Sequence, residues 1–418
     1  MPMKYFFQRM ALYAIVLLAV SCKGKSGQEK QSDNIPPFPT FDLQQEYAKK
    51  EMSYQDIAEV EYIPLETNDS SLISSTRYMF VSEKMIVALE SKEGNIIFFD
   101  RKGKYLHSFS HKGESGEEYL DASRMTVDFA AEEVYIYDYR GVATSYIQVY
   151  GFDGTYKRTF KYPTVKLLKI TDYDKDYLFA EDETFMFARQ DGKNVKEPTH
   201  TPYGLISKQT GEIKTFPLYV EERINGTFVE TTLDTETEWR GITINFPLSP
   251  VSVAGNRIVI SDFGLDTIYI CHDGRLQPIA AKSNRVTEMK STIMTEVCAL
   301  TDRYLLLCTQ DKRLLTKTPS ISVPDPIYLL YDRTTGETCN ILFQNADGIT
   351  YTESVNEMSL WPHSSHAILP PNTMRMAYKP DFLLEKYEKG ELKGRLKEIA
   401  SQLDIEDNPV LVLVRFKE

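Results

Sequence analysis

Residues 85–109 contain three short segments rich in β-branched and aromatic residues: Met85-Ile-Val-Ala-Leu-Glu90, Ile96-Ile-Phe-Phe-Asp100 and Tyr105-Leu-His-Ser-Phe109. Residues of these types favour pleated, half-buried surfaces, so each segment predicts a strand. Lys102-Gly103-Lys104 separates the last two segments, and a two-residue hairpin turn favours glycine because it needs a positive φ. The stretch therefore predicts three consecutive antiparallel strands.

The same pattern returns along the chain. Its clearest copy is Val134-Tyr-Ile-Tyr-Asp138, Tyr146-Ile-Gln-Val-Tyr150, Asp153-Gly154 and Tyr156-Lys-Arg-Thr-Phe160, and weaker copies lie in 177–216, 257–276 and 304–343. The turn glycines are at positions 103, 154, 211, 274 and 336, so their intervals are 51, 57, 63 and 62 residues. Units of this size match the four-stranded blades of a β-propeller better than solenoid repeats.

The two ends of the repeated region supply a sixth blade. Pro409–Phe416 is an apolar strand at the C-terminus and Val60–Leu65 is an early strand; pairing them removes two unpaired edges. Val410, Val412 and Val414 would then face one side of the blade, and Leu411 and Leu413 the other. We predict an all-β fold in residues 41–418, a six-bladed β-propeller closed by its N- and C-terminal strands. Before the last strand, helical spacing predicts a short helix outside the ring that carries Leu392, Leu396, Ile399, Ala400 and Leu403.

The first 22 residues have the layout of a secretion signal. Lys4 and Arg9 precede an apolar run, Met10–Val20, whose eleven residues are too few to span a bilayer. The run ends in Leu18-Ala19-Val20-Ser21-Cys22, which resembles the lipobox of bacterial lipoproteins. We expect a signal peptide over 1–21, lipidation of Cys22 and a flexible tether over 22–40. The alternative is an ordinary signal peptide that ends near a cysteine.

A family resemblance covers most of residues 57–418. Phe99-Asp100-x-x-Gly103-Lys104, Gly113 to Glu118-Tyr119 and Val134-Tyr-Ile-Tyr-Asp138 resemble the six-bladed β-propeller lipoproteins of Gram-negative bacteria. These proteins are distant relatives of NHL-repeat propellers and are largely of unknown function. The chain departs from the family in the loop Gly113-Glu-Ser-Gly-Glu-Glu118-Tyr119, which lacks the family's middle glycines and proline.

The charge of the chain limits the class of partner. The formal net charge is −12, and it becomes −14 when Lys4 and Arg9 leave with residues 1–21. A nucleic-acid-binding protein needs a basic face, and no cluster of Lys and Arg is found in the sequence. We therefore expect a protein or carbohydrate partner and no nucleic acid.

Acidic residues end the second strand of four blades, at Glu90, Asp138, Glu181 and Asp262. If they lay close to the axis, their carboxylates could hold Ca²⁺. The alternative, which the repetition favours, is that each accepts hydrogen bonds from backbone N–H groups of the following turn. The denser acidic runs in 172–176 and 181–183 are interpreted as solvated loops.

The histidines and the glycine loop give no catalytic motif. Gly113–Tyr119 lacks the lysine and the Ser/Thr of a phosphate-binding loop and is interpreted as a turn. His363-Ser-Ser-His366 could contribute two metal ligands, but no third is visible, and the His107 and His111 pair falls in a strand and a turn. We identify no catalytic, cofactor-binding or metal-binding residue and expect no cofactor.

The four cysteines after the tether leave their pairing open. Four cysteines allow three pairings, and the sequence does not choose among them. Cys298 and Cys308 flank a predicted turn and could face each other, more often as reduced thiols than as a bridge; the other two are Cys271 and Cys339.

Two functions remain. We expect a lipoprotein of the cell envelope, in the outer membrane and facing the periplasm, whose propeller is a binding or scaffold module rather than an enzyme. The alternative is a propeller enzyme, of hydrolase, lactonase or lyase type, that acts at the central funnel, and this rests on analogy of fold.

Overall fold

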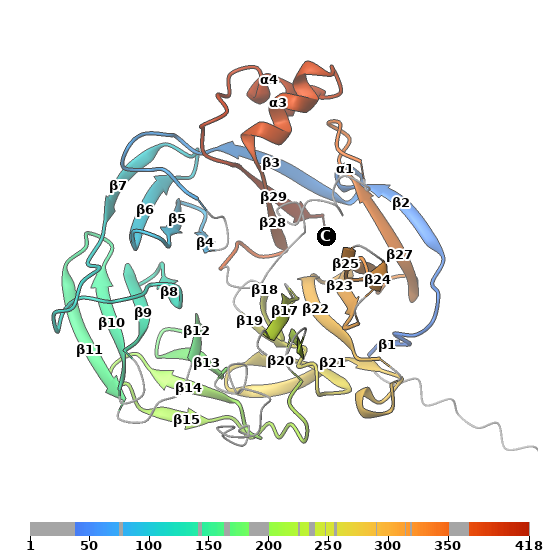
Figure 1. The fold of residues 1–418 in the computed structure, drawn as a ribbon, viewed down its shortest axis with the longest axis horizontal. Helices are drawn as coiled ribbons and strands as arrows, with labels where there is room; N and C mark the ends of the chain where they lie inside the picture. Colours follow the sequence, from blue (N-terminus) through green and yellow to red (C-terminus); the bar gives the residue numbers. More distant parts are fainter. Residues whose placement is uncertain are drawn as a thin grey trace, which may run out of the picture. The chain divides into compact units, whose positions relative to one another are not determined.

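The computed structural model describes residues 38–417 except 75–77, 141–143, 163–167, 184–199, 225, 234–238, 247, 255–256, 290, 314, 318–319 and 351–367. Its strands form the six blades of a β-propeller (Figure 1), as the repeat predicts. Blades 1 to 3 are four-stranded meanders. Blade 1 contains β4 (Met79–Val81), β5 (Met85–Glu90), β6 (Asn95–Asp100) and β7 (Tyr105–Phe109), and blade 2 contains β8 (Met125–Asp128), β9 (Glu133–Tyr139), β10 (Ser145–Gly151) and β11 (Tyr156–Tyr162). Blade 3 contains β12 (Leu168–Asp172), β13 (Tyr177–Asp182), β14 (Tyr203–Ser207) and β15 (Ile213–Thr215).

Blades 4 and 5 each contain a fifth strand that the repeat did not predict. Their meanders are β18 (Val251–Ala254), β19 (Arg257–Ile260), β20 (Thr267–His272) and β21 (Arg275–Lys282), and β22 (Ile293–Leu300), β23 (Tyr304–Asp311), β26 (Ile327–Asp332) and β27 (Glu337–Gln344). Upstream, β1 (Thr40–Phe41) pairs in parallel with β21, and β2 (Lys49–Ser53) pairs in parallel with β27. Thr40, at the end of the predicted tether, therefore already lies on blade 4.

Blade 6 is built from both ends of the propeller chain. It contains β28 (Thr373–Tyr378), β29 (Val410–Phe416) and β3 (Ala58–Pro64), in that order. β29 pairs antiparallel with β3, with Val410 opposite Pro64 and Phe416 opposite Ala58. The predicted pairing of the last strand with the early strand is thus present, in a blade of three strands within the described residues.

Glycine in the turn and apolar residues on both faces explain why the blades form and stack. The five turn glycines, at 103, 154, 211, 274 and 336, all have φ between 68° and 86°, a region that favours glycine. Six apolar clusters fill the six seams between neighbouring blades, including the seam between blades 6 and 1. Val410, Val412 and Val414 belong to the cluster shared with blade 5, and Leu411 and Leu413 to the cluster shared with blade 1, as the alternation predicts.

Helices and hairpins interrupt the meanders. The predicted C-terminal helix is α4 (Gly394–Ala400), and α3 (Pro380–Glu388), which was not predicted, packs against it outside the ring beside blade 6 (Figure 1). The other elements are α1 (Tyr54–Ile57), a 3₁₀ turn (Val286–Glu288), and the hairpins β16–β17 (Thr227–Leu233, Trp239–Asn245) and β24–β25 (Leu315–Lys317, Ser320–Ser322). Among the described residues, none of the helices has the length and hydropathy that a bilayer span requires.

Candidate functional site

The four predicted carboxylates at the ends of second strands are all buried, with exposed fractions of 9% or less. Glu90 accepts hydrogen bonds from the N–H groups of Ser74 and Lys92, at 2.6 and 3.1 Å. Asp138 accepts the N–H of Leu120 at 3.0 Å, and its other oxygen lies 2.6 Å from Nε of Arg140. Both carboxylates hold backbone N–H groups, but of these three only the Lys92 N–H belongs to a following turn, as predicted, whereas Ser74 and Leu120 lie in preceding loops.

Asp262 accepts the N–H of Gly264 in the following turn at 2.8 Å, as the structural interpretation predicts, and it also shares a cation with Glu181. The guanidinium of Arg223 lies 3.8 Å from Glu181 and 3.7 Å from Asp262, and the Tyr203 hydroxyl donates to Asp262 at 2.5 Å. All four side chains lie where blades 3 and 4 meet. Burial raises the pKa of Glu181 to about 7, although Lys169 and Arg223 act to lower it.

The buried charges continue along inner strands of the ring. Nζ of Lys169, on β12, donates to Oγ of Ser249 at 2.7 Å, and the Ser249 N–H donates to Glu296, on β22, at 2.9 Å. Burial lowers the pKa of Arg375, on β28, to about 10, while the nearby Glu296 carboxylate acts to raise it. We call these groups the inner network, which comprises Lys169, Glu181, Tyr203, Arg223, Ser249, Asp262, Glu296 and Arg375.

The sequence analysis missed most of the inner network. Lys169, Arg375 and Glu296, on blades 3, 6 and 5, are at most 6% exposed. The side chain of Arg223, in the segment after β15, is 2% exposed. A signal was present, because Leu168-Lys169-Ile170 and Met374-Arg375-Met376 each place one charge inside an apolar strand. A charge buried in this way requires a partner, but the sequence does not identify that partner.

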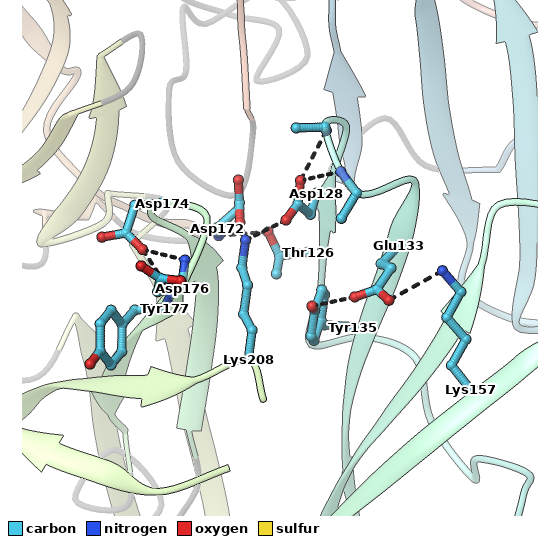
Figure 2. A network of polar contacts seen from close by, with 12 residues as sticks. Thr126, Asp128, Glu133, Tyr135, Lys157, Asp172, Asp174, Asp176, Tyr177 and Lys208 are labelled. Atoms are coloured by element: carbon cyan, nitrogen blue, oxygen red, sulfur yellow. Dashed lines mark hydrogen bonds and ion pairs between the residues drawn. The ribbon is translucent and has the colours of Figure 1, made fainter. Parts of the chain in front are cut away.

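A second buried cluster joins blades 2 and 3 (Figure 2). Nζ of Lys208 lies 2.5 Å from both Asp128, at the end of β8, and Asp172, at the end of β12. The Asp172 N–H also donates to Oγ1 of Thr126 at 2.9 Å. Burial raises the pKa of Asp172 to about 7 and the Asp128 carboxylate adds to the rise, while Lys208 acts to lower it. We call Asp128, Asp172 and Lys208 the seam cluster.

The seam cluster and the inner network correct the interpretation of the acidic runs. Asp172 is half-buried, and Glu181 and Asp182 are buried in β13, so these residues are not solvated loops. Only the turn at 174–176 fits that description, since Asp174 accepts the N–H of Asp176 at 2.8 Å. Composition alone could not separate the two cases. A carboxylate that is buried against a lysine from a distant part of the chain has the same local sequence as a carboxylate in solvent.

Figure 2 also shows a second group on the blade 2 side of the seam. Glu133 accepts hydrogen bonds from Nζ of Lys157 at 3.2 Å and from the hydroxyl of Tyr135 at 2.5 Å. Nη2 of Arg158 also lies 2.7 Å from Glu133. Burial acts to raise the pKa of Glu133, but these donors outweigh it and lower the pKa to about 2. Arg158 in turn donates to the carbonyl of Lys208, so the group connects with the backbone of blade 3.

The glycine loop is a turn, as predicted. The guanidinium of Arg140 donates to the carbonyls of Ser115 and Glu118, and Nε2 of Gln148 donates to Gly116. The loop carbonyls thus bind the Arg140 cation, and the Ser115 N–H donates to the Glu118 carboxylate of the same loop at 2.8 Å. These groups are therefore already used within the turn.

The histidines and cysteines of the described part have structural surroundings. Ring Nε2 atoms of His107 and His111 lie 2.8 and 2.7 Å from backbone carbonyls of blade 2. Cys271, Cys298 and Cys308 are free thiols in the core, and Cys339 is a half-buried free thiol. Within the described ranges, no three His, Cys, Asp or Glu side chains lie where they could hold a metal ion. His363, His366 and Cys22 lie outside those ranges.

An open pocket of about 500 Å³ lies on blade 6. The wall on the blade 1 side carries Glu59 and Glu61 of β3, Arg415 of β29 and Arg101 of the β6–β7 turn. The other wall carries Arg395 of α4 and Asp347, which follows β27. Arg101 forms a two-pronged ion pair with Glu61, at 3.0 and 2.7 Å, and Arg415 lies 3.0 Å from Glu83. In contrast to the inner network, these charges are in contact with solvent.

Comparison with known proteins identifies the fold and leaves the activity open. A family model described as a domain of unknown function (DUF4934) matches residues 38–415. Among solved structures, a protein of Bacteroides fragilis NCTC 9343 described as exported matches with a TM-score of 0.59 and 14% identity, over 89% of this chain and 99% of that one. A DUF4221 member from Bacteroides vulgatus matches with a TM-score of 0.46 and 12% identity, over 87% of this chain and 99% of that one. No curated protein matches the chain.

Proposed function

From the premise that this chain belongs to the DUF4934 family, we propose that it is an exported lipoprotein whose propeller binds another macromolecule and performs no catalysis. The acidic chain favours a protein or carbohydrate as partner over a nucleic acid. Its exposed groups would make the contacts, and its buried charges would hold the blades in place.

The observation that carries this proposal is that the buried acids and bases bind one another. Lys208 is held between Asp128 and Asp172, and Arg223 lies between Glu181 and Asp262. A general acid or base must reach a substrate atom within hydrogen-bonding distance. Five of these six side chains are at most 6% exposed, and Asp172 is 23% exposed. Side chains that are buried in this way and already paired are better suited to stabilising a scaffold.

The anchoring part of the proposal rests on the leader sequence. Leu18-Ala19-Val20-Ser21-Cys22 matches a lipobox, and a solved structure of the same fold belongs to a protein described as exported. We propose acylation of Cys22 and location at the outer membrane, facing the periplasm. Two or more acyl chains give stable membrane binding, because each buried CH₂ contributes about 0.8 kcal/mol.

One observation favours the alternative of a propeller enzyme. Glu181 has a pKa raised to about 7, and a carboxyl that exchanges its proton near neutral pH is typical of catalytic acids. Its side chain is only 3% exposed, however, and it lies beside Arg223. An enzymatic role for Glu181 would therefore require an opening of the seam between blades 3 and 4.

Two measurements test the proposed function. Cell fractionation should find the wild-type protein in the outer membrane and the Cys22→Ala variant in the soluble fraction. The purified full-length protein should not turn over ester, lactone or glycoside substrates. Turnover that disappears in Glu181→Gln, with Glu385→Gln as an exposed control, would replace the binding function with the enzymatic one.

A further inference from the structure

The outer edge of blade 6 differs from those of its neighbours. On blades 4 and 5, strands β1 and β2 add in parallel to the outermost strand of the meander. On blade 6, β3 is the third and last strand of the sheet within the described residues. The fold thus adds extended segments to two outer edges, whereas among the described residues no strand adds to β3, which has α4 packed close to it.

The backbone groups on this edge can be assigned from the ladder. The Lys417 N–H donates to the carbonyl of Ile57, and the Phe416 N–H donates away from β3, to Asn372. Because bonding directions alternate along an antiparallel pair, residues 59, 61 and 63 bond to β29 and Val60 and Tyr62 point their N–H and C=O groups outwards. No hydrogen bond to these groups is found among the described residues. The edge ends in Pro64, which has no N–H.

The pocket of about 500 Å³ follows this same edge. Val60 and Tyr62, on the face toward blade 5, and Glu59 and Glu61, on the face toward blade 1, all line it. The lining also includes Leu413 of β29 and Thr373 of β28, so the cavity extends from β3 onto the blade 1 face of the sheet. The outward peptide groups of β3 thus border a groove with charged residues on the blade 1 side and on the side of α4.

We propose that this groove binds an extended segment of a partner protein, which adds to β3 as the fourth strand of blade 6. The inference rests on the proposed binding function and names its site and the class of its ligand. Main-chain hydrogen bonds to Val60 and Tyr62 supply affinity, and the walls select alternate side chains.

The charges of the walls define the segment. On one wall, the Arg395 side chain is 63% exposed, and its ion-pair partner among the described residues is Glu398 of the same helix, at 2.9 Å. Exposed pairs of this kind contribute about 0–1 kcal/mol and exchange partners easily. On the other wall, Glu59 is exposed and has no ion pair with a described residue. Since neighbouring side chains of a strand point to opposite faces, the segment carries an acidic residue next to a basic one.

Binding of a synthetic peptide tests the inference. The probe is a fluorescein-labelled hexapeptide, Thr-Val-Lys-Glu-Val-Thr, and the protein is the full chain with Cys22→Ala, measured by fluorescence anisotropy. Arg395→Glu and Glu59→Lys should each weaken binding at least about fivefold, and the double variant should recover it because the peptide can turn over. Arg285→Glu removes a matched exposed helical pair, Arg285–Glu288, and should change nothing. Equal binding by all variants, or no binding by the wild type, overturns the inference.

Two further measurements locate the contact. Val60→Pro removes one outward N–H without removing a bond to β29, so it should abolish binding while the melting temperature stays near that of the wild type. If this variant unfolds, hydrogen exchange on the wild type decides. The peptide should slow exchange at Val60 and Tyr62 and leave Glu59 and Glu61 unchanged, because the latter are already bonded to β29. Protection elsewhere, or a dimer in light scattering that Val60→Pro abolishes, contradicts a peptide groove.

The outcomes separate this inference from the proposed function. A partner that still binds the Val60→Pro variant leaves the binding function intact and removes only the groove. Turnover of a substrate removes the binding function, whatever the peptide does.

Discussion

The seam cluster of blades 2 and 3 is buried, whereas the open pocket on blade 6, here called the rim pocket, is in contact with solvent. Both contain acidic and basic side chains. The Lys208 side chain is 5% exposed and has two carboxylates at 2.5 Å. Arg395 and Glu398 at the rim are more than 60% exposed and form a single pair. A buried charge cannot exchange its partner for water, whereas an exposed one can. The comparison teaches that burial, not residue type, separates structural charges from charges that are available to a ligand.

Deleting residues 409–418 is expected to have the largest effect, because it removes the strand beneath the rim pocket. β29 is the central strand of blade 6, and its residues Val410–Val414 are at most 2% exposed. Five such side chains contribute about 1.5–3 kcal/mol each on full burial, a sum close to the whole stability of a domain, about 5–15 kcal/mol. We expect loss of soluble, cooperatively folding protein, measured by calorimetry. Deleting 23–36 should leave the melting temperature unchanged, and a truncated chain that melts like the full one would refute the role of β29.

Substituting Lys208 tests the buried side of the comparison. Lys208→Met leaves Asp128 and Asp172 close together without their cation, and removing one partner of a buried ion pair costs about 3–5 kcal/mol. Urea unfolding should show this loss. Lys175→Met, at a lysine that is 90% exposed, should change the free energy of unfolding by less than about 0.5 kcal/mol. Adding Asp128→Asn and Asp172→Asn to Lys208→Met should recover part of the stability; no recovery would show that packing, not charge, was lost.

The parts of the fold that the sequence predicts are those that short segments decide. Gly103 and its four equivalents mark hairpin turns, and the alternation in Val410–Phe416 predicts which side chains share a face of the blade. The parallel strands β1 and β2 were missed because neither Thr40–Phe41 nor Lys49–Ser53 has an apolar pattern of its own. They are strands because an adjacent blade offers an edge.

The candidate sites depend on pairs that are distant in the chain. Lys208 and Asp128 are 80 residues apart, and Glu181 and Asp262 come from different blades to lie beside Arg223. Lys208 follows a strand in a sequence where a solvated lysine would be equally acceptable. Its burial is a result of ring geometry, which brings the ends of β8, β12 and β14 together. Periodicity within one blade contains no information about that contact.

The pH dependence of stability tests an intermediate case, Glu133. Its pKa is lowered to about 2 by donors that include Arg158, so the ionised carboxylate stabilises the folded state above the unfolded pKa of about 4.5. That contribution, about 2 kcal/mol, is lost as the pH falls from about 4.5 toward 2. Urea unfolding should therefore show Glu133→Gln less stable than wild type at pH 7, with a difference that shrinks toward pH 3. Glu385→Gln, at an exposed glutamate, should show no such trend, and a constant difference for Glu133→Gln would contradict the assigned pKa.

Substituting Arg101, at the rim pocket, is expected to have the smallest effect on the free energy of unfolding. Its ion pair with Glu61 has good geometry, with contacts of 3.0 and 2.7 Å, but the Glu61 side chain is 51% exposed. Arg101→Ala should therefore cost less than about 1 kcal/mol in urea unfolding at low salt. In 1 M NaCl the Debye length falls to about 3 Å, so that small difference should vanish while the loss in Lys208→Met persists. The two substitutions measured at both salt concentrations test the comparison directly, because only a buried charge keeps its energetic role when exposed charges are screened. Equal salt sensitivity would mean that solvent reaches the seam cluster, and the distinction between structural and available charges would then fail.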